Sequence, residues 1–316
     1  MIPTFPKFKK ISRNDRAEIL SYTKDFLPYS DYNFNSLWSW DTTGEMRLSI
    51  LNGNLIVMLP DYISGEPALS FIGNKKLKKT VADLLDYADK KDITSGLTLV
   101  PEIAISKLQK KDFKIEEDED HFDYIFSTKK LSELTGKSFK TKRLMAKRFI
   151  TNQPEATFKT SLVSNPESHK QILEVLKNWG GKKTKKEDLV LENRAIRRTL
   201  MLSKMDKNEL LLAGVYLNDE LLAFSIDEVL SIGYAISHFF KVKNDYKGVS
   251  EYLNQQTAQF LHENGVELWN WEQDLGIEGL KKSKTGYRPV QFLKKYKIQK
   301  NIYYNNKTKL YLVKNE

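Results

Sequence analysis

Apolar residues recur along the chain at helical and strand spacing, and the same order of elements occurs twice. The segment from Ser12 to Asp15 has the spacing of a capping box, and Asn165-Pro166 supplies the N-cap and first residue of a second helix. Asn52-Gly53 and Asn218-Asp219 each join two apolar runs, as the turn of a β-hairpin does. Each half of the chain is therefore predicted to open with a helix and to continue with a hairpin.

The later elements also form pairs. Two helical stripes consist of Leu77, Val81, Leu84, Leu85 and Ala88 in the first half, and of Val249, Leu253, Thr257, Phe260 and Leu261 in the second. Strands at 96–100 and 265–269 follow, then short helices around Ile105 and Ile277, and closing strands near 122–126 and 291–297. Partners lie about 170 residues apart, a constant separation that indicates a duplication. Residues 45–127 and 210–297 are expected to superpose element by element.

The repeated order predicts the fold class and the domain boundaries. Antiparallel hairpins combined with one helical crossover give an α/β (α+β) fold, a mixed and mostly antiparallel sheet flanked by helices, in each of two tandem domains. We expect these domains to be residues 1–150, which end in a basic connecting helix, and residues 151–316, which carry the main site.

Composition narrows the chemistry. The chain has no cysteine and four histidines, which excludes disulfides, thiolate nucleophiles and zinc–thiolate sites and makes a histidine-rich metal site an unfavoured reading. No signal peptide and no run of about 18 apolar residues is visible, so a cytoplasmic protein without a transmembrane segment is expected. The formal charge of +10 fits an anionic partner, although a codon-driven lysine content would give the same value. The oligomeric state stays open.

Three motifs carry a resemblance to a known family. They are residues 269–284, WNWEQDLGIEGLKKSK, continued by Tyr287-Arg288-Pro289; residues 123–128, DYIFST, followed by Leu131, Leu134, Gly136, Lys142 and Arg143; and residues 244–248, NDYKG. This pattern resembles the C-terminal domain family of phosphatidylglycerol lysyltransferases, whose two lobes are GNAT-like acyltransferase domains. One departure is the segment from Lys140 to Leu144, where relatives commonly show a Lys-Lys-Arg-Asn-like core.

The resemblance implies an acyl- or aminoacyltransferase. Its donor would be an acyl-CoA or an aminoacyl-tRNA, its acceptor an amine or a hydroxyl, and it would hold no covalently bound cofactor and no metal. The sequence does not show the multi-span part of the lipid enzymes, so contact with lipid is expected only as peripheral binding to an acidic surface. The alternative is a non-catalytic module that binds a phosphorylated metabolite or RNA.

Candidate catalytic residues follow the strand predicted to begin at Gly265. Glu272 and Asp274 come directly after it, where ligands commonly bind in open α/β sheets, and a carboxylate there could accept the proton of the acceptor. The alternative is that Asp274 caps a helix beginning at Leu275 and that Glu272 is solvated. Tyr287 could donate a proton to the leaving group, or could simply pack.

Candidate donor-binding residues lie at a helix start and on a basic helix. Lys247, Gly248 and Val249 begin the helix of the second apolar stripe, whose free N–H groups could bind a phosphate, although most helix starts bind nothing. Lys281 and Lys284 lie one turn apart, with Arg288 nearby, and could clamp the same anion. A second basic stretch consists of Lys137, Lys140, Lys142, Arg143, Lys147 and Arg148. Charged runs of this kind are usually solvated.

Overall fold

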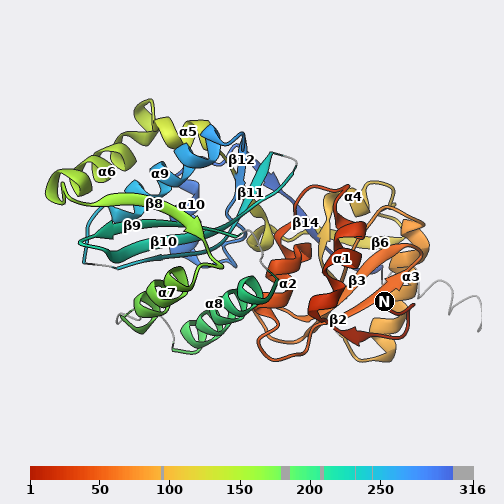
Figure 1. The fold of residues 1–316 in the computed structure, drawn as a ribbon. Helices are drawn as coiled ribbons and strands as arrows, with labels where there is room; N and C mark the ends of the chain where they lie inside the picture. Colours follow the sequence, from red (N-terminus) through yellow and green to blue (C-terminus); the bar gives the residue numbers. More distant parts are fainter. Residues whose placement is uncertain (94–95, 179–185, 207–209, 232, 244, 302–316) are drawn as a thin grey trace, which may run out of the picture. The chain divides into compact units, whose positions relative to one another are not determined.

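The computed structural model describes residues 1–93, 96–178, 186–206, 210–231, 233–243 and 245–301 (Figure 1). The chain forms two compact units. Unit 1 consists of residues 1–34, 43–122 and the chain from 293 onward, and unit 2 consists of residues 35–42 and 123–292. A single boundary after residue 150 therefore does not separate the units, because the chain leaves unit 1 after Phe122 and returns at Leu293.

Each unit contains a seven-stranded mixed sheet. The order in unit 1 is β1 (Lys9–Lys10), β2 (Arg47–Leu51), β3 (Asn54–Pro60), β4 (Pro67–Ile72), β5 (Leu97–Pro101), β14 (Lys295–Lys300) and β6 (Phe113–Glu117). The order in unit 2 is β8 (Thr157–Leu162), β9 (Leu210–Leu217), β10 (Glu220–Val229), β11 (Tyr234–Val242), β12 (Leu268–Asn270), β7 (Asp123–Ser127) and β13 (Gln291–Leu293). The two orders match strand for strand, and both hairpin turns join the second strand to the third, as predicted.

The last strands of the two halves are exchanged between the units. β14 pairs antiparallel with β5 and β6 in unit 1, and β7 pairs antiparallel with β12 in unit 2. The predicted superposition of 45–127 on 210–297 is therefore wrong for its closing strands, since each belongs to the other unit. Inside unit 1, Lys295 of β14 is fully buried and forms an ion pair with Asp31. A buried pair of this kind favours a single register for the strand.

Helices cover the sheets. In unit 1 they are α1 (Arg16–Thr23), α3 (Leu77–Lys90) and α4 (Glu102–Ile105). In unit 2 they are α5 (Thr128–Glu133), α6 (Lys140–Asn152), α7 (Pro166–Asn178), α8 (Lys186–Asp206), α9 (Val249–Glu263) and α10 (Glu278–Thr285). α2 (Phe34–Trp40) begins at the last residue of unit 1 and continues in unit 2.

The cores follow the predicted periodicities. The predicted stripe of α3 packs on unit 1's sheet with Ile56, Leu69 and Phe71. In unit 2, α7 and α8 pack with Leu212 and Phe224, whereas α6 and α9 pack with Ala213 and Ala223, the next residues along the same strands. Because neighbouring strand residues point to opposite faces, the two pairs of helices cover opposite faces of that sheet (Figure 1).

The local start signals are also present. Asp15 accepts hydrogen bonds from the backbone N–H and the hydroxyl of Ser12, and Asn165 Oδ1 accepts one from the N–H of Glu167 at 2.9 Å. Both residues of each hairpin turn have positive φ, at 53° and 79° for Asn52-Gly53 and at 49° and 63° for Asn218-Asp219. These are the angles that a type I′ turn requires.

Candidate functional site

Glu272 lies just beyond β12 in unit 2, and its backbone is fixed from both sides. Its φ of 56° is in the left-handed region, which non-glycine residues seldom adopt outside functional or strained positions. The N–H of Glu272 donates to Asn270 Oδ1 at 2.7 Å, and its carbonyl accepts from the N–H of Tyr124 at 3.1 Å. The side chain keeps 17% of its surface exposed, so part of it faces solvent.

His238 is the extra residue of a β-bulge in β11, beside Glu272. Ile226 of β10 faces Phe239, and the next residue, Asp227, faces Ser237, so His238 has no partner in the ladder. Bulges re-aim a side chain and are common next to active sites. β11 and β12 run parallel, with Ile236 opposite Asn270. His238 lies two residues after Ile236, and Glu272 lies two residues after Asn270, so the two residues lie alongside each other.

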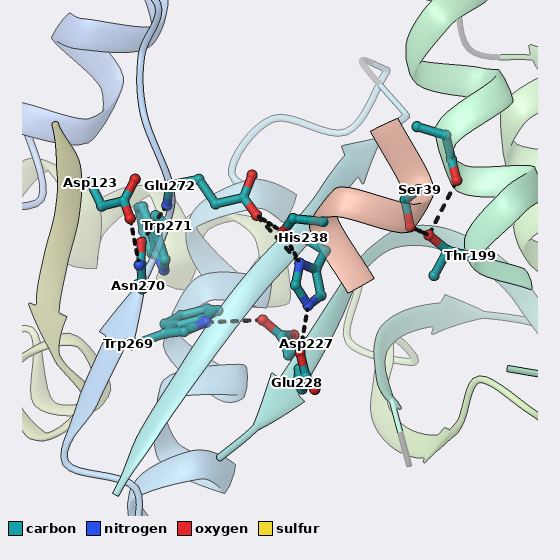
Figure 2. A network of polar contacts seen from close by, with 12 residues as sticks. Ser39, Asp123, Thr199, Asp227, Glu228, His238, Trp269, Asn270, Trp271 and Glu272 are labelled. Atoms are coloured by element: carbon teal, nitrogen blue, oxygen red, sulfur yellow. Dashed lines mark hydrogen bonds and ion pairs between the residues drawn. The ribbon is translucent and has the colours of Figure 1, made fainter. Parts of the chain in front are cut away.

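The imidazole of His238 joins two carboxylates (Figure 2). Its Nδ1 lies 3.3 Å from Glu272 Oε1, and its Nε2 lies 3.2 Å from Glu228 Oε2. Ser36 of α2 adds a hydroxyl 3.3 Å from both Nδ1 and Glu272 Oε1. Burial by itself would lower the pKa of His238, but the two carboxylates outweigh it and raise the pKa to about 9. The ring is therefore an imidazolium at neutral pH and donates to both glutamates.

Two buried hydrogen bonds hold β12 in place behind this cluster (Figure 2). Trp269 Nε1 donates to Asp227 Oδ1 at 2.9 Å, and Asn270 Nδ2 donates to Asp123 Oδ2 at 3.0 Å. Burial raises the pKa of Asp227 to about 6, with Ser225 and Trp269 opposing the shift through their hydrogen bonds. The exchanged strand β7, which carries Asp123, thus supports the segment that ends in Glu272.

Asp274 has a different position from Glu272. Its carboxylate is buried, accepts the hydroxyl hydrogen bond of Tyr124, and accepts another from the N–H of Gly276 at 2.8 Å. The helix that follows begins at Glu278 and not at Leu275, so Asp274 shapes the turn before the helix instead of capping it. Of the two predicted carboxylates, Glu272 is the one with access to solvent.

Tyr287 is part of the core of unit 2. Its ring packs edge-on against Trp271 at 5.0 Å between centroids and lies 4.1 Å from Lys142 Nζ. Only 2% of the residue is exposed, and burial raises the pKa of its hydroxyl far above the ordinary value. Trp271 and Trp269 also pack edge-on at 5.0 Å, so this aromatic group stabilises the segment around Glu272.

The start of α9 is explained by packing. Gly248 has a φ of 89°, and a β-carbon on it would lie 2.1 Å from the carbonyl oxygen of Met145 in α6. Glycine is therefore required for the close approach of two helices. Val249 is buried and Lys247 is exposed, while Asn244 at the start of the motif lies outside the described residues.

Lys284 contacts the backbone of the loop that carries Glu272. Its Nζ donates to the carbonyl oxygens of Trp271 at 2.6 Å, Glu272 at 3.2 Å and Gln273 at 2.6 Å. An ammonium group has three N–H donors, so these carbonyls match its capacity. Lys281 and Arg288 are exposed. The contacts of Lys284 indicate that it positions Glu272, a role the sequence did not suggest.

A comparison with protein families decides the identity of the fold. The family model described as "Phosphatidylglycerol lysyltransferase, C-terminal" matches residues 24–299. The chain belongs to this family. The match spans residues of both units and confirms the expected family, whose fold is of the aminoacyl- and acyltransferase type. A search of curated protein sequences found no match.

Solved structures agree with the family assignment. A conserved protein of unknown function from Bacteroides thetaiotaomicron VPI-5482 has a TM-score of 0.75 and 25% identity, covering 95% of this chain and 100% of that one. L-PGS from Bacillus licheniformis has a TM-score of 0.59 and 14% identity, covering 92% and 93%. FemX has a TM-score of 0.53 and 11% identity, covering 92% and 96%. At these identities L-PGS and FemX show the shared fold of the family and nothing finer.

Two further observations bear on ligands of this family member. In the part of the chain that the structure describes, no helix is both long and apolar enough to cross a bilayer. The same residues include no group of His, Asp and Glu side chains arranged to hold a metal ion. Glu228, His238 and Glu272 are joined by hydrogen bonds.

Proposed function

We propose that the protein is an acyl- or aminoacyltransferase in which Glu272 is the general base. The donor would be an acyl-CoA thioester or an aminoacyl-tRNA ester, and the acceptor an amine or a hydroxyl. Membership of the family supports the reaction class. The observation that carries the residue assignment is the partly exposed Glu272 carboxylate, held by His238 at the end of β12.

The reaction would proceed by attack of the acceptor on the donor carbonyl. As the new C–N or C–O bond forms, Glu272 accepts the proton that the acceptor nitrogen or oxygen loses. The C–S bond of a thioester or the C–O bond of an ester then breaks, and the leaving group takes a proton from solvent. Tyr287 has no role in this scheme, because its hydroxyl is buried and the raised pKa makes it a weak proton donor.

His238, Glu228 and Lys284 act as positioning residues in this proposal. The imidazolium donates to Glu272 and is itself held by Glu228, while Lys284 holds the loop carbonyls. Together they fix the direction of the carboxylate before substrates bind. Preorganisation of this kind lowers the barrier because no reorientation is needed during the reaction.

The test begins with the donor. Thermal-shift measurements with CoA thioesters and with deacylated tRNA identify the donor class, because a ligand that binds the folded state raises its apparent stability. Transfer is then followed with a labelled acyl or aminoacyl group on that donor. Glu272→Gln should lower kcat by roughly 10²–10⁴-fold and leave donor affinity unchanged.

Asp274→Asn is the matched control. It also removes one carboxylate charge from the same loop, but the buried side chain contacts Tyr124 and Gly276. We expect a lower melting temperature with kcat of the folded fraction retained. Wild-type turnover in Glu272→Gln would refute the base assignment, and the absence of transfer by the wild-type protein from any donor that binds it would favour the binding-module alternative.

A further inference from the structure

The segment that contains α6 carries positive charge and has no acidic residue within it. Residues 134–154 contain Lys137, Lys140, Lys142, Arg143, Lys147 and Arg148 and no Asp or Glu. Lys142 pairs with Glu251 at 3.4 Å. Within the described ranges, the other five make no ion pair. The positive charge of this surface is therefore not neutralised by the protein.

A cavity lies at the start of this segment in unit 2. It has a volume of about 360 Å³ and is lined by Thr135, Gly136, Lys137, Lys140 and Arg143. Arg143 Nη1 donates to the carbonyl oxygens of Leu134 and Gly136, which ties α6 to the preceding turn. The buried side chains of Leu134 and Phe139 anchor the same turn in the core. The backbone that lines the cavity is therefore fixed by these hydrogen bonds and buried side chains, whereas the cations of the lining face solvent.

The chemistry of the lining selects an oxyanion. Its side chains offer three cations and one hydroxyl, and no carboxylate. Arg143 Nη1 is engaged by the two turn carbonyls, so the remaining N–H groups of its guanidinium are the donors for phosphate oxygens, and Lys137 and Lys140 add point charges. A phosphate or diphosphate group carries enough charge to engage all three.

We propose that this cavity binds the phosphate or diphosphate group of a small phosphorylated molecule. The proposal does not rest on the transfer reaction, because it concerns other residues and a binding equilibrium. Lys147 and Arg148 continue the basic surface along α6 but do not line the cavity. Substitution of these two residues therefore serves as a control that distinguishes a specific phosphate site from general attraction to polyanions.

Calorimetric titration of the 316-residue chain with inorganic pyrophosphate, at about 0.15 M ionic strength, is the test. Lys137→Gln/Lys140→Gln removes two charges from the cavity, and Lys147→Gln/Arg148→Gln removes two charges from α6 outside the cavity. All four side chains are exposed, so both variants should fold, as circular dichroism will verify. We expect the first to weaken binding at least about tenfold and the second by less than about twofold.

Parallel titrations distinguish the sources of phosphate. Short single-stranded RNA and vesicles containing phosphatidylglycerol are tested under the same conditions. Binding of pyrophosphate with the stated difference between variants, undiminished in Glu272→Gln, supports the proposal whether or not transfer activity is found. Equal weakening in both variants, or binding of RNA or vesicles without binding of pyrophosphate, would overturn it.

Discussion

His238 is a buried imidazolium between two glutamates, and its charge state sets the charge of the whole group. With Glu228 and Glu272 ionised, the protonated ring leaves one net negative charge beside the strand end, and the neutral ring leaves two. Loss of the proton would also remove one of the two ring N–H donors. The position of the Glu272 carboxylate therefore depends on pH.

This dependence gives a prediction for stability. The unfolded His has a pKa near 6.5, and the folded pKa is about 9, so the stabilising contribution is complete below about 6.5 and is lost as pH rises through 9. Over that window it amounts to the order of 3 kcal/mol. Urea unfolding of wild type and His238→Gln across this range should show a stability difference that shrinks as pH rises. Parallel curves for the two proteins would contradict the assignment.

Site residues could be predicted from the sequence where their position depends only on a neighbouring element of the chain. Glu272 was found because it follows a strand, and strand ends are exposed at the edge of a sheet. His238 and Glu228 were not, because their meeting depends on a bulge and on the pairing of β10 with β11, which are not local properties. Lys284 was expected to hold an anion but contacts three carbonyls, since the turn at 274–277 brings the loop to it.

At the scale of elements, the close approach of α6 to α9 explains why glycine occupies the N-cap position of α9. Gly248 is the N-cap of α9, and Met145 of α6 lies where a side chain at that position would be. The same glycine, taken from the sequence alone, suggests a turn that cradles phosphate. Only the long-range packing of the second helix shows why it is needed here.

Gly248→Ala should therefore destabilise the protein by roughly 3 kcal/mol or more, through backbone strain and displacement of α6. Gly279→Ala is the control, because a β-carbon at this position of α10 meets no atom within 4 Å and its φ is not positive. We expect that variant to match wild type or to gain up to about 1 kcal/mol. Chemical unfolding measures both. Unchanged stability of Gly248→Ala would remove the packing explanation.

Elements with strong local signals were predicted well. The hairpins at Asn52-Gly53 and Asn218-Asp219 and the stripes of α3 and α9 appear as expected, since turn residues and apolar periodicity act over a few neighbours. The predicted boundaries of some strands were less accurate. The strand expected from Gly265 begins at Leu268, because Gly265 has a φ of 80° and belongs to the turn after α9.

At the scale of the whole molecule, the exchange of β7 and β14 makes each unit depend on the opposite half of the sequence. The sequence indicates two closing strands but not their destinations. Both have the same place in the repeat, and pattern alone does not decide which sheet a strand completes. The expected boundary at residue 150 followed from assuming that each half keeps its own strand.

Fragments test this organisation directly. Residues 1–150 lack β14, which lies between β5 and β6, and residues 151–316 lack β7, which lies between β12 and β13. Each fragment alone should fail to show a cooperative thermal transition. Co-expression of the two should restore a soluble complex, because each supplies the missing strand. A cooperative transition for 151–316 alone would show that β7 is dispensable.

The exchange of strands also determines when the sheet of unit 1 can be completed during protein synthesis. β5 and β6 leave the ribosome early, but β14, which lies between them, is made about 200 residues later, or roughly 10–40 s at ordinary elongation rates. Until then unit 1 exposes two unpaired strand edges, which are templates for aggregation. Its sheet is completed only after β14 has been made, so the nascent chain should need protection by chaperones over that interval. Stop codons or frameshifts before residue 295 would thus impair unit 1, although its other strands lie far upstream in the sequence.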